Sequence, residues 1–332
     1  MKIFAYALRP YDEQAYFEQF CQANGVEYGY TAAYPSPDNV ELAKGYDAIT
    51  IITNLMYPEI LDRFKEMGIK YIATRSIGYD HIDVAYANAI GIRATHVTYS
   101  PNSVANYTIM MMLMACRKID YIMEKAKVND FGLQGKMGRE LSLSTVGVIG
   151  TGKIGEAVIK HLSGFGCKIL AYDLYEKDSV KEYATYVDLD TLYRESDIIT
   201  LHVPGLEENH HMINADIFGK MKKGVILVNA ARGMLIDTDA MIEALNSGQV
   251  GFAALDTFED EQGLYYLNFE QKPLANRTLS LLKGMPNVMF SPHMAFYTDQ
   301  AVWDMVGNAI KGLLAFEQEG DCLLYTSPSP RD

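Results

Sequence analysis

Arg232, His293 and one of the acids of DTFEDE, namely Asp256, Glu259 or Glu261, are side chains whose types suit acid/base chemistry, and each follows a short apolar run. A guanidinium can hold a carboxylate or polarise a carbonyl group, and it stays charged at physiological pH. An imidazole can give or take a proton near neutral pH, and a carboxylate on its other nitrogen can fix its tautomer. Singly, these residues also fit a loop charge, a helix cap and a packed core histidine, so their shared placement matters more than any one of them.

That placement follows from a repeated pattern of apolar runs and helical segments. The runs of strand length lie at 48–53, 71–74, 145–149, 168–172, 198–202, 225–229, 252–255 and 288–291. Segments between them, such as 154–165 and 239–247, have helical spacing and end at a glycine. Strands that are apolar on both sides and alternate with helices predict a parallel sheet covered on both faces. Such sheets bind ligands beyond the carboxyl ends of their strands, where the three side chains stand.

A glycine-rich turn, GTGKIG at 150–155, predicts a dinucleotide site. It follows the run 145–149 and opens a helical segment, so backbone N–H groups and the positive end of a helix dipole would face a pyrophosphate. Asp173 ends the next run, where a carboxylate can bind the adenosine ribose hydroxyls and repel a 2′-phosphate. The sequence therefore favours NAD over NADP, although Lys177 leaves use of both open.

Composition argues against several other classes of function. The chain has 332 residues and a net charge of −13 with dispersed acidic residues, which disfavours a nucleic-acid partner. No apolar run reaches the roughly 20 residues that cross a bilayer, and MKIFAYALRP is typical of a first strand rather than a signal peptide. Disulfides and a metal site are not indicated, because the cysteines are far apart and the pair His210–His211 has no neighbouring ligand at a suitable spacing. We expect a cytoplasmic protein without a membrane partner.

Several motifs together resemble the signature blocks of the D-2-hydroxyacid dehydrogenase family: GTGKIG with Asp173, then HVP, NAARG, DTFEDE and SPHMAFYT. The resemblance extends to about residue 321, and within the family the chain is similar to D-lactate dehydrogenases of fermentation and of vancomycin-resistance clusters. It implies an α/β fold with two Rossmann-like, doubly wound domains, and a homodimer. A NAD-binding domain at 101–298 would be inserted into a flavodoxin-like substrate domain at 1–100 and 299–322, while the tail 323–332 is interpreted as non-native.

The same resemblance assigns roles to individual residues. The catalytic group would be Arg232, Glu261 and His293. The contacts to NAD would be Gly150, Gly152, Lys153, Ile154, Gly155, Asp173, Val203, Pro204, Asn209, Ala230, Ala231, Arg232 and Asp256. The substrate contacts would be Ile77, Gly78, Tyr99, Arg232 and Phe296, with the backbone N–H groups of Ile77 and Gly78 holding a carboxylate.

The implied activity is that of an NAD-dependent D-2-hydroxyacid dehydrogenase, an oxidoreductase of fermentation that reduces pyruvate to D-lactate. Hydride would come from NADH and the proton from His293, in a cleft closed by domain movement. Bulkier 2-oxo acids remain alternatives, namely 2-oxoisocaproate, phenylpyruvate and 2-oxoglutarate. A rival from another class is an NADH-sensing, corepressor-like binding protein, since the same fold serves as such a scaffold.

Overall fold

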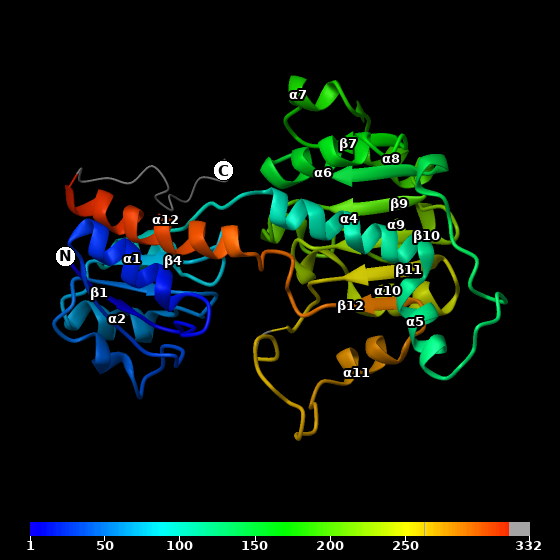
Figure 1. Cartoon of the computed structure of the whole chain (residues 1–332). Coiled ribbons are helices and arrows are strands. Elements are labelled where there is room, and N and C mark those ends of the chain that lie inside the picture. Colours follow the sequence, from blue (N-terminus) through cyan, green and yellow to red (C-terminus); the bar gives the residue numbers. More distant parts are fainter. Residues whose placement is uncertain (262, 319–332) are drawn as a thin grey trace. The chain divides into compact units, whose positions relative to one another are not determined.

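The chain folds into two compact α/β units, shown in the computed structural model of Figure 1. The structure describes residues 1–261 and 263–318, so the tail at 323–332 lies outside the described residues. The first unit contains Met1–Ser100 and the chain from Tyr297 onward, and the second contains Pro101–Phe296. Both sheets are parallel throughout, which confirms the fold class predicted from the alternating runs.

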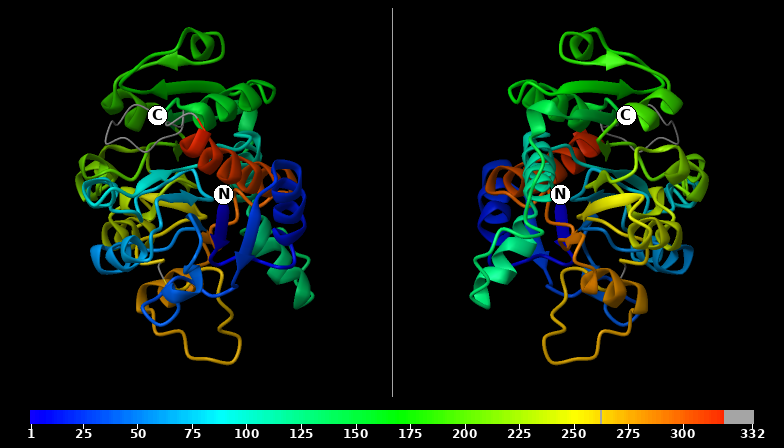
Figure 2. Two further views of the ribbon diagram at one scale, coloured as in Figure 1. Left: turned by 90° about the vertical axis from the view of Figure 1, so that its left-hand side faces the viewer. Right: turned by 90° about the vertical axis from the view of Figure 1, so that its right-hand side faces the viewer.

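The sheet of the first unit has the strand order β2-β1-β3-β4-β5. Its elements are β1 (Lys2–Ala5), β2 (Glu27–Tyr30), β3 (Ala48–Ile51), β4 (Tyr71–Thr74) and β5 (Arg93–Thr95), with helices α1 (Gln14–Asn24), α2 (Pro58–Glu66), α3 (Val84–Ala89) and α12 (Asp299–Gln318). Helix α12 packs beside α1 and β4, so the last described helix completes the unit that the start of the chain builds (Figure 2). Helices α2 and α3 bury Ile60, Leu61, Phe64 and Ala87 against the sheet.

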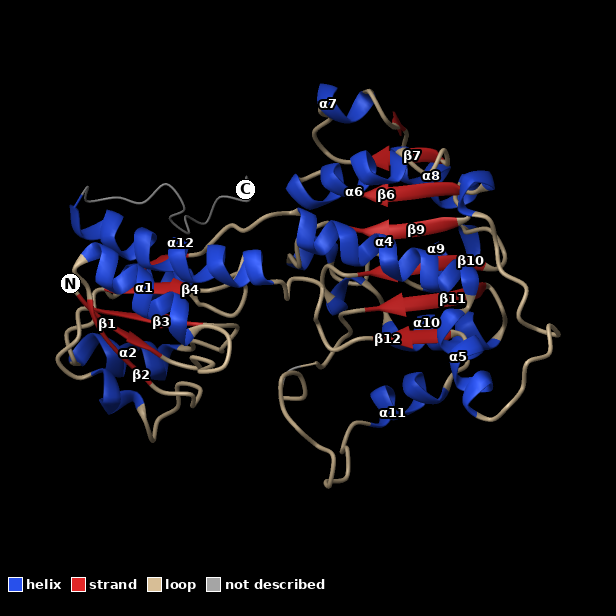
Figure 3. Ribbon diagram, in the orientation of Figure 1, coloured by secondary structure: helices blue, strands red, loops and turns tan. Residues whose placement is uncertain are grey.

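The sheet of the second unit has the order β12-β11-β10-β9-β6-β7-β8. Its strands are β6 (Thr145–Ile149), β7 (Lys168–Tyr172), β8 (Thr185–Tyr186), β9 (Ile198–Leu201), β10 (Val225–Asn229), β11 (Val250–Leu255) and β12 (Val288–Phe290). Its helices are α4 (Asn102–Arg117), α5 (Ile119–Lys127), α6 (Lys153–Ser163), α7 (Asp178–Lys181), α8 (Leu189–Glu195), α9 (Ala215–Lys220), α10 (Thr238–Asn246) and α11 (Arg277–Gly284). Figure 3 shows helices on both faces of this sheet.

Alternate residues of the central strands pack on opposite faces of this second sheet. Ile226 and Val228 of β10 belong to the core that contains α4 and α6. Val225 and Leu227 belong to the core that contains α8, α9 and α10. Because both faces are covered, side chains on both sides of the strand are buried, which explains the largely apolar runs of the sequence.

Helix α4 ends at Arg117 because Lys118 adopts a left-handed backbone with φ 52, and α5 begins at the next residue. None of the residues of α5 is buried. Large apolar side chains stay exposed from α5 to residue 143, and we call this stretch the apolar segment 119–143. They are Ile119, Met123, Val128, Phe131, Leu133, Met137 and Leu143. No helix in the described part of the chain has the length and apolarity of a membrane span.

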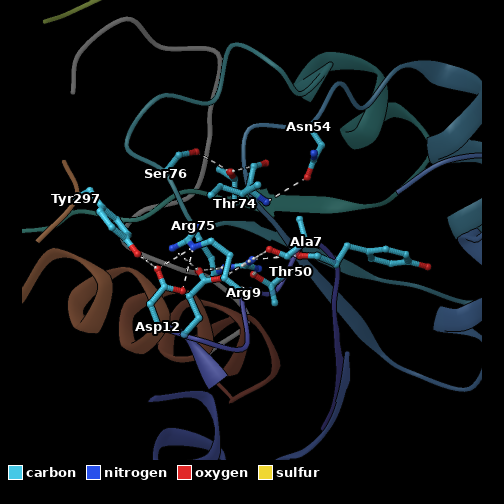
Figure 4. Close-up of polar contacts among 12 residues, drawn as sticks. Ala7, Arg9, Asp12, Thr50, Asn54, Thr74, Arg75, Ser76 and Tyr297 are labelled. Carbon is cyan, nitrogen blue, oxygen red and sulfur yellow. Dashed lines mark hydrogen bonds and ion pairs between the residues drawn. The ribbon is translucent and has the colours of Figure 1, made fainter. Parts of the chain in front are cut away.

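A buried ion-pair cluster occupies the carboxyl edge of the first sheet (Figure 4). Arg75, directly after β4, is fully buried, and its Nε donates to Oε1 of Glu13 at 2.9 Å. Its terminal nitrogens donate to the hydroxyl of Thr50 at 3.2 Å and to the carbonyl oxygens of Tyr6 and Ala7, both at 3.1 Å. The guanidinium is therefore satisfied on every side, as a buried charge must be.

Arg9 and Tyr297 extend this cluster to the returning chain. Nε of Arg9 donates to both carboxylate oxygens of Asp12, at 3.0 and 2.9 Å. Oδ2 of Asp12 also accepts from the hydroxyl of Tyr297 at 2.6 Å, a contact drawn in Figure 4. The cluster thus fastens the first residue of the returning chain to the loop that follows β1.

Candidate active site

His293 and Glu261 form a hydrogen-bonded pair in the second unit. Nδ1 of His293 lies 2.8 Å from Oε1 of Glu261, and the two side chains are 22% and 23% exposed. Oε2 of Glu261 accepts from the backbone N–H of Phe258 at 3.2 Å. Nε2 of His293 has no hydrogen bond to any described residue. An imidazole held at one nitrogen by a carboxylate can present the other to a reacting group.

The strand order brings the loops of the predicted catalytic group to one edge of the sheet. Strands β12, β11 and β10 are neighbours, and their register aligns their carboxyl ends. His293 follows β12, Glu261 follows β11 and Arg232 follows β10. This edge is where open parallel sheets place ligands.

The loop that carries His293 is held by the buried carboxylate of Asp256. Oδ1 accepts from the hydroxyl of Ser291 at 2.6 Å and from the N–H of Met294 at 2.8 Å, and Oδ2 accepts from the N–H of Ala295 at 2.9 Å. The N–H of His293 donates to the carbonyl of Asp256 at 2.8 Å. His293 has φ 54, a left-handed conformation that costs energy in any residue other than glycine. Asp256 therefore holds a strained loop and positions the histidine.

Burial raises the pKa of Asp256 above its ordinary value of 3.8. The hydrogen bonds from Ser291, Met294 and Ala295, and the charge of His293, act in the opposite direction without overcoming burial. A proton is therefore held more tightly on this carboxylate than on an exposed aspartate.

Arg232 stands at the turn between β10 and a short 3₁₀ helix at Gly233–Leu235. Its carbonyl accepts from the side-chain amide of Asn229 at 2.8 Å, and its Nη1 donates to the carbonyl of Ala231 at 2.9 Å. A side chain at Gly233 would overlap the backbone of Phe258, so glycine allows the turns after β10 and β11 to touch. The backbone of Arg232 is thereby held at the sheet edge.

Two tyrosines that the sequence did not single out flank His293. The ring of Tyr265 lies 6.3 Å from the imidazole at 88°, and the ring of Tyr266 lies 6.4 Å from it. The hydroxyl of Tyr266 donates to the carbonyl of His293 at 3.2 Å, and its ring lies 6.3 Å from that of Phe296. The hydroxyl of Tyr265 is buried without a hydrogen-bond partner among the described residues. Their signal in the sequence, two adjacent aromatics in LYYL, is equally typical of a packed loop.

The glycine-rich turn has the shape that a pyrophosphate requires. Gly150 has φ 94, and a Cβ there would lie 2.5 Å from the carbonyl oxygen of His202. A Cβ at Gly155 would overlap the carbonyl of Gly150, whereas a Cβ at Gly152 would meet nothing within 4 Å. No side chain caps the N-terminus of α6, so its first N–H groups remain for a ligand. The residues of the turn fit the phosphates of NAD.

Asp173 lies beside this turn. Its Oδ2 accepts from the N–H and the hydroxyl of Thr151, at 2.5 and 3.1 Å, and its Oδ1 accepts from the N–H of Tyr175 at 3.1 Å. The hydroxyl of Thr151 also lies 2.8 Å from that of Tyr186. Oδ1 keeps a further lone pair, which a ribose hydroxyl can use.

The other residues predicted to contact NAD follow strands of the same sheet. Val203 and Pro204 follow β9, and the side-chain amide of Asn209 donates to the carbonyl of Pro204 at 2.9 Å. Ala230 and Ala231 follow β10, and the N–H of Ala231 donates to an asparagine side chain at 3.0 Å. Strands β6, β9 and β10 are adjacent, so these loops share the edge of the glycine-rich turn.

Ile77, Gly78 and Tyr99, the predicted substrate contacts outside the second unit, lie in the first unit and are half-buried. Ile77 and Gly78 follow β4, in a turn where the hydroxyl of Ser76 donates to the carbonyl of Gly78 at 2.7 Å. The N–H groups of Ile77 and Gly78 make no hydrogen bond within the described residues. Two adjacent unpaired N–H groups can bind a carboxylate.

Comparison with known proteins identifies relatives along nearly the whole chain. The family model "D-isomer specific 2-hydroxyacid dehydrogenase, NAD binding domain" matches residues 109–295. An aromatic 2-oxoacid reductase of Clostridium sporogenes is 45% identical over 325 residues, covering 97% of this chain and 98% of that protein. A D-lactate dehydrogenase of Lactiplantibacillus plantarum is 39% identical over 324 residues, covering 96% of this chain and 97% of that protein.

Solved structures match both units. The structure of a D-2-hydroxyisocaproate dehydrogenase has a TM-score of 0.88 and 37% identity, covering 98% of this chain and 99% of that chain. Two further matches, from Lactobacillus delbrueckii ssp. bulgaricus and Lactobacillus jensenii, were solved with NAD, at 30% and 31% identity. The matched NAD-binding domain and these complexes identify the cofactor of the chain as NAD(H).

Proposed function

Because the chain belongs to the D-isomer-specific 2-hydroxyacid dehydrogenase family, we propose that it reduces pyruvate to D-lactate with NADH. The observation that carries the proposal is the hydrogen-bonded pair of His293 and Glu261. Arg232 lies at the same edge of the sheet, because it follows the neighbouring strand β10. Relatives named D-lactate dehydrogenase match nearly the full chain, which supports pyruvate as the substrate. In this proposal the first unit is the substrate domain, and the second unit is the NAD-binding domain.

NADH, when bound, supplies the hydride. In the proposed reaction His293 gives its Nε2 proton to the carbonyl oxygen of the substrate. Glu261 keeps its hydrogen bond to Nδ1 and stabilises the positive charge that the imidazole carries before the transfer. Arg232 binds the substrate carboxylate or polarises the neighbouring carbonyl through its permanent charge. In the oxidative direction His293 accepts the proton.

The residues proposed to bind NAD and the substrate have N–H groups or carboxylate oxygens that can still accept a ligand. The N-terminus of α6 with Lys153 and Ile154, and the carboxylate of Asp173, would hold the phosphates and the adenosine ribose. The unpaired N–H groups of Ile77 and Gly78 would hold the substrate carboxylate. Their availability supports these roles.

A second candidate substrate is an aromatic 2-oxo acid such as phenylpyruvate. The observation that favours it is a group of rings, in which Tyr265 and Tyr266 lie beside the imidazole and Phe296 lies beside Tyr266. These rings offer flat apolar faces. The relative from Clostridium sporogenes, named aromatic 2-oxoacid reductase, adds support. Both candidates use the same catalytic residues and differ only in what surrounds the side chain of the substrate.

Steady-state turnover separates these candidates. NADH oxidation would be followed by absorbance with pyruvate, phenylpyruvate, 2-oxoisocaproate and 2-oxoglutarate, and the configuration of the product determined by chiral chromatography. We expect the highest kcat/KM with pyruvate and a D product. A higher kcat/KM with phenylpyruvate would replace the first candidate by the second. Tight NADH binding without turnover of any of the four acids would contradict the dehydrogenase proposal and favour an NADH sensor.

We further propose that the chain acts in the cytoplasm, in a fermentative pathway, as a homodimer. The apolar segment 119–143 supports the dimer, because Phe131 and Leu133 are 76% and 88% exposed and a second copy could cover them. Light scattering after size exclusion should give twice the chain mass of 37.2 kDa. Replacing Phe131 and Leu133 by aspartate should yield monomers, whereas Leu42→Asp, at an exposed apolar position of the first unit, should not. A monomeric wild type would contradict the proposal.

A further inference from the structure

Outside the proposed catalytic group, two histidines and a glutamate meet in the second unit. His210 and His211 follow β9, and Glu259 follows β11. The two imidazole rings are stacked with centroids 3.9 Å apart at 24°, and Nε2 of His211 lies 2.6 Å from Oε1 of Glu259. One nitrogen or oxygen of each side chain lies within 4.8 Å of the other two. The sequence showed only the adjacent histidines, because the sheet, and not local spacing, brings Glu259 beside them.

Two of the three side chains are held in place, and the third is exposed. His211 has φ 50, a left-handed conformation that residues other than glycine rarely adopt, and its N–H donates to the carbonyl of Met234 at 2.9 Å. Oε2 of Glu259 accepts from the N–H and the hydroxyl of Thr238, at 3.2 and 2.7 Å. His210 is exposed, whereas His211 and Glu259 are half-buried. An ion can therefore approach a fixed imidazole and carboxylate from the side of His210.

We propose that His210, His211 and Glu259 bind a divalent transition-metal ion of the zinc class. Two imidazole nitrogens and one carboxylate oxygen are donors that such ions prefer, and three protein ligands leave a fourth position for water. Ligand atoms around tetrahedral zinc lie about 3.3 Å apart, so the 2.6 Å contact between His211 and Glu259 must open by about 0.7 Å. The Nε2 proton of His211 moves to Nδ1 of the same ring, so that Nε2 binds the ion as part of a neutral imidazole. Oδ2 of Asp237, 4.0 Å from Nδ1 of His211, adds negative charge beside the site.

Metal binding at this cluster has a route to the proposed catalytic group. Glu259 lies in the turn between Phe258 and Glu261, and the N–H of Phe258 donates to Oε2 of Glu261 at 3.2 Å. His211 is bonded to the segment that follows Arg232. An ion that draws Glu259 toward His210 shifts this turn and slows turnover. This consequence rests on the proposed function, whereas the binding itself does not.

Calorimetric titration of the tag-free, metal-stripped full chain with Zn²⁺ tests the site. We expect one ion per chain in the wild type, with affinity reduced roughly tenfold or more in His210→Ala and in Glu259→Gln. His161→Ala, which removes a histidine from α6, serves as the matched control and should bind like the wild type. Absence of stoichiometric binding, or wild-type affinity in His210→Ala, would overturn the proposal.

Turnover in the same buffers tests the coupling. Zinc that saturates the wild type should slow its NADH oxidation, and a chelator should restore it. His210→Ala should match the wild type in chelator and keep its rate at that zinc concentration. Equal inhibition of both proteins would refute the coupling through this cluster. If no 2-oxo acid is reduced, the proposed function fails, and the titration still decides the metal site by itself.

Discussion

Glu13 and Asp256 are fully buried carboxylates, one in each unit, and their pKa values move in opposite directions. Burial raises the pKa of both. At Glu13 the charges of Arg75 and Arg9, with their hydrogen bonds, outweigh burial and leave the pKa below its ordinary 4.5. At Asp256 a hydroxyl, two backbone N–H groups and the charge of His293 do not outweigh burial, and the pKa stays above 3.8.

This contrast distinguishes a carboxylate that stabilises the fold of its unit from one that positions a proposed catalytic residue. Glu13 faces permanent cations and stays ionised, so its pair with Arg75 ties the loop after β1 to the end of β4. Asp256 accepts hydrogen bonds from the loop of His293 and stabilises the left-handed conformation of that histidine. We therefore expect loss of the first to unfold its unit and loss of the second to disturb turnover.

Replacing Arg75 by methionine should have the largest effect on stability. Glu13 would keep only the more distant Arg9, and removing one partner of a buried ion pair costs about 3–5 kcal/mol. Trp303, the single tryptophan of the chain, lies in α12, so its fluorescence during urea unfolding reports on the first unit. The midpoint of that transition should fall strongly, and adding Glu13→Gln should restore part of it. An unchanged midpoint would remove the distinction between the two carboxylates.

Asp256→Asn should destabilise the second unit less, by about 1–3 kcal/mol, because an amide group cannot accept all the bonds that the carboxylate accepts. Turnover should fall with it, since the loop of His293 loses a support, while the Trp303 transition stays in place. Ser291→Ala removes only one of the hydrogen-bond donors, so it should lower both the stability of the second unit and the turnover by less. The readouts are far-UV circular dichroism in urea and kcat. A shift of the Trp303 transition equal to that of Arg75→Met would contradict the assignment.

Acid should unfold the first unit before the second. The lowered pKa of Glu13 contributes stability that is complete above 4.5 and is lost as the pH falls through the folded-state value. The raised pKa of Asp256 has the opposite sign, because the folded state binds the proton more tightly and gains stability as the pH falls toward 3.8. In an acid titration at low ionic strength, Trp303 fluorescence should therefore change at a higher pH than the pH at which NADH binding is lost. The reverse order would contradict the comparison, and Glu13→Gln should flatten the Trp303 profile.

Tyr266→Phe and Tyr265→Phe form a matched pair with the smallest expected effects. Tyr266→Phe removes the bond to the carbonyl of His293, so kcat should fall about 2–10-fold with little change in the NADH dissociation constant. Tyr265→Phe removes a buried hydroxyl without a partner among the described residues, so kcat should stay within about twofold and stability should not fall. An unchanged kcat in both variants would mean that the rings, and not the hydroxyl bond, support the loop, and equal losses in both would mean that the bond from Tyr266 has no special role.

The fold was predictable where its signals are local. The runs at 145–149, 168–172 and 225–229 coincide with β6, β7 and β10, because strands buried on both faces must be apolar. Strands β2, β5 and β8 were not predicted, and all three lie at a sheet edge. An edge strand needs less apolar surface, and β5 and β8 have only three and two residues.

The candidate site was predictable only in part, because contacts between distant segments leave no local pattern. Arg232 and His293 could be placed because recognisable strands precede them. The bond from Tyr266 and the approach of Glu259 to His211 depend on loop conformations, with φ 64 at Tyr266 and 50 at His211. The pair of Arg75 and Glu13 joins residues 62 positions apart, and no local pattern in the sequence indicates it.

The most direct test of the proposed mechanism compares wild type with His293→Ala in a single turnover of bound NADH. The variant should bind NADH as the wild type does, because the glycine-rich turn is unchanged, and should reduce the preferred 2-oxo acid about 10²–10⁴-fold more slowly. Hydride transfer within about threefold of the wild-type rate would show that another group supplies the proton. Such a result would contradict the role proposed for the His293–Glu261 pair.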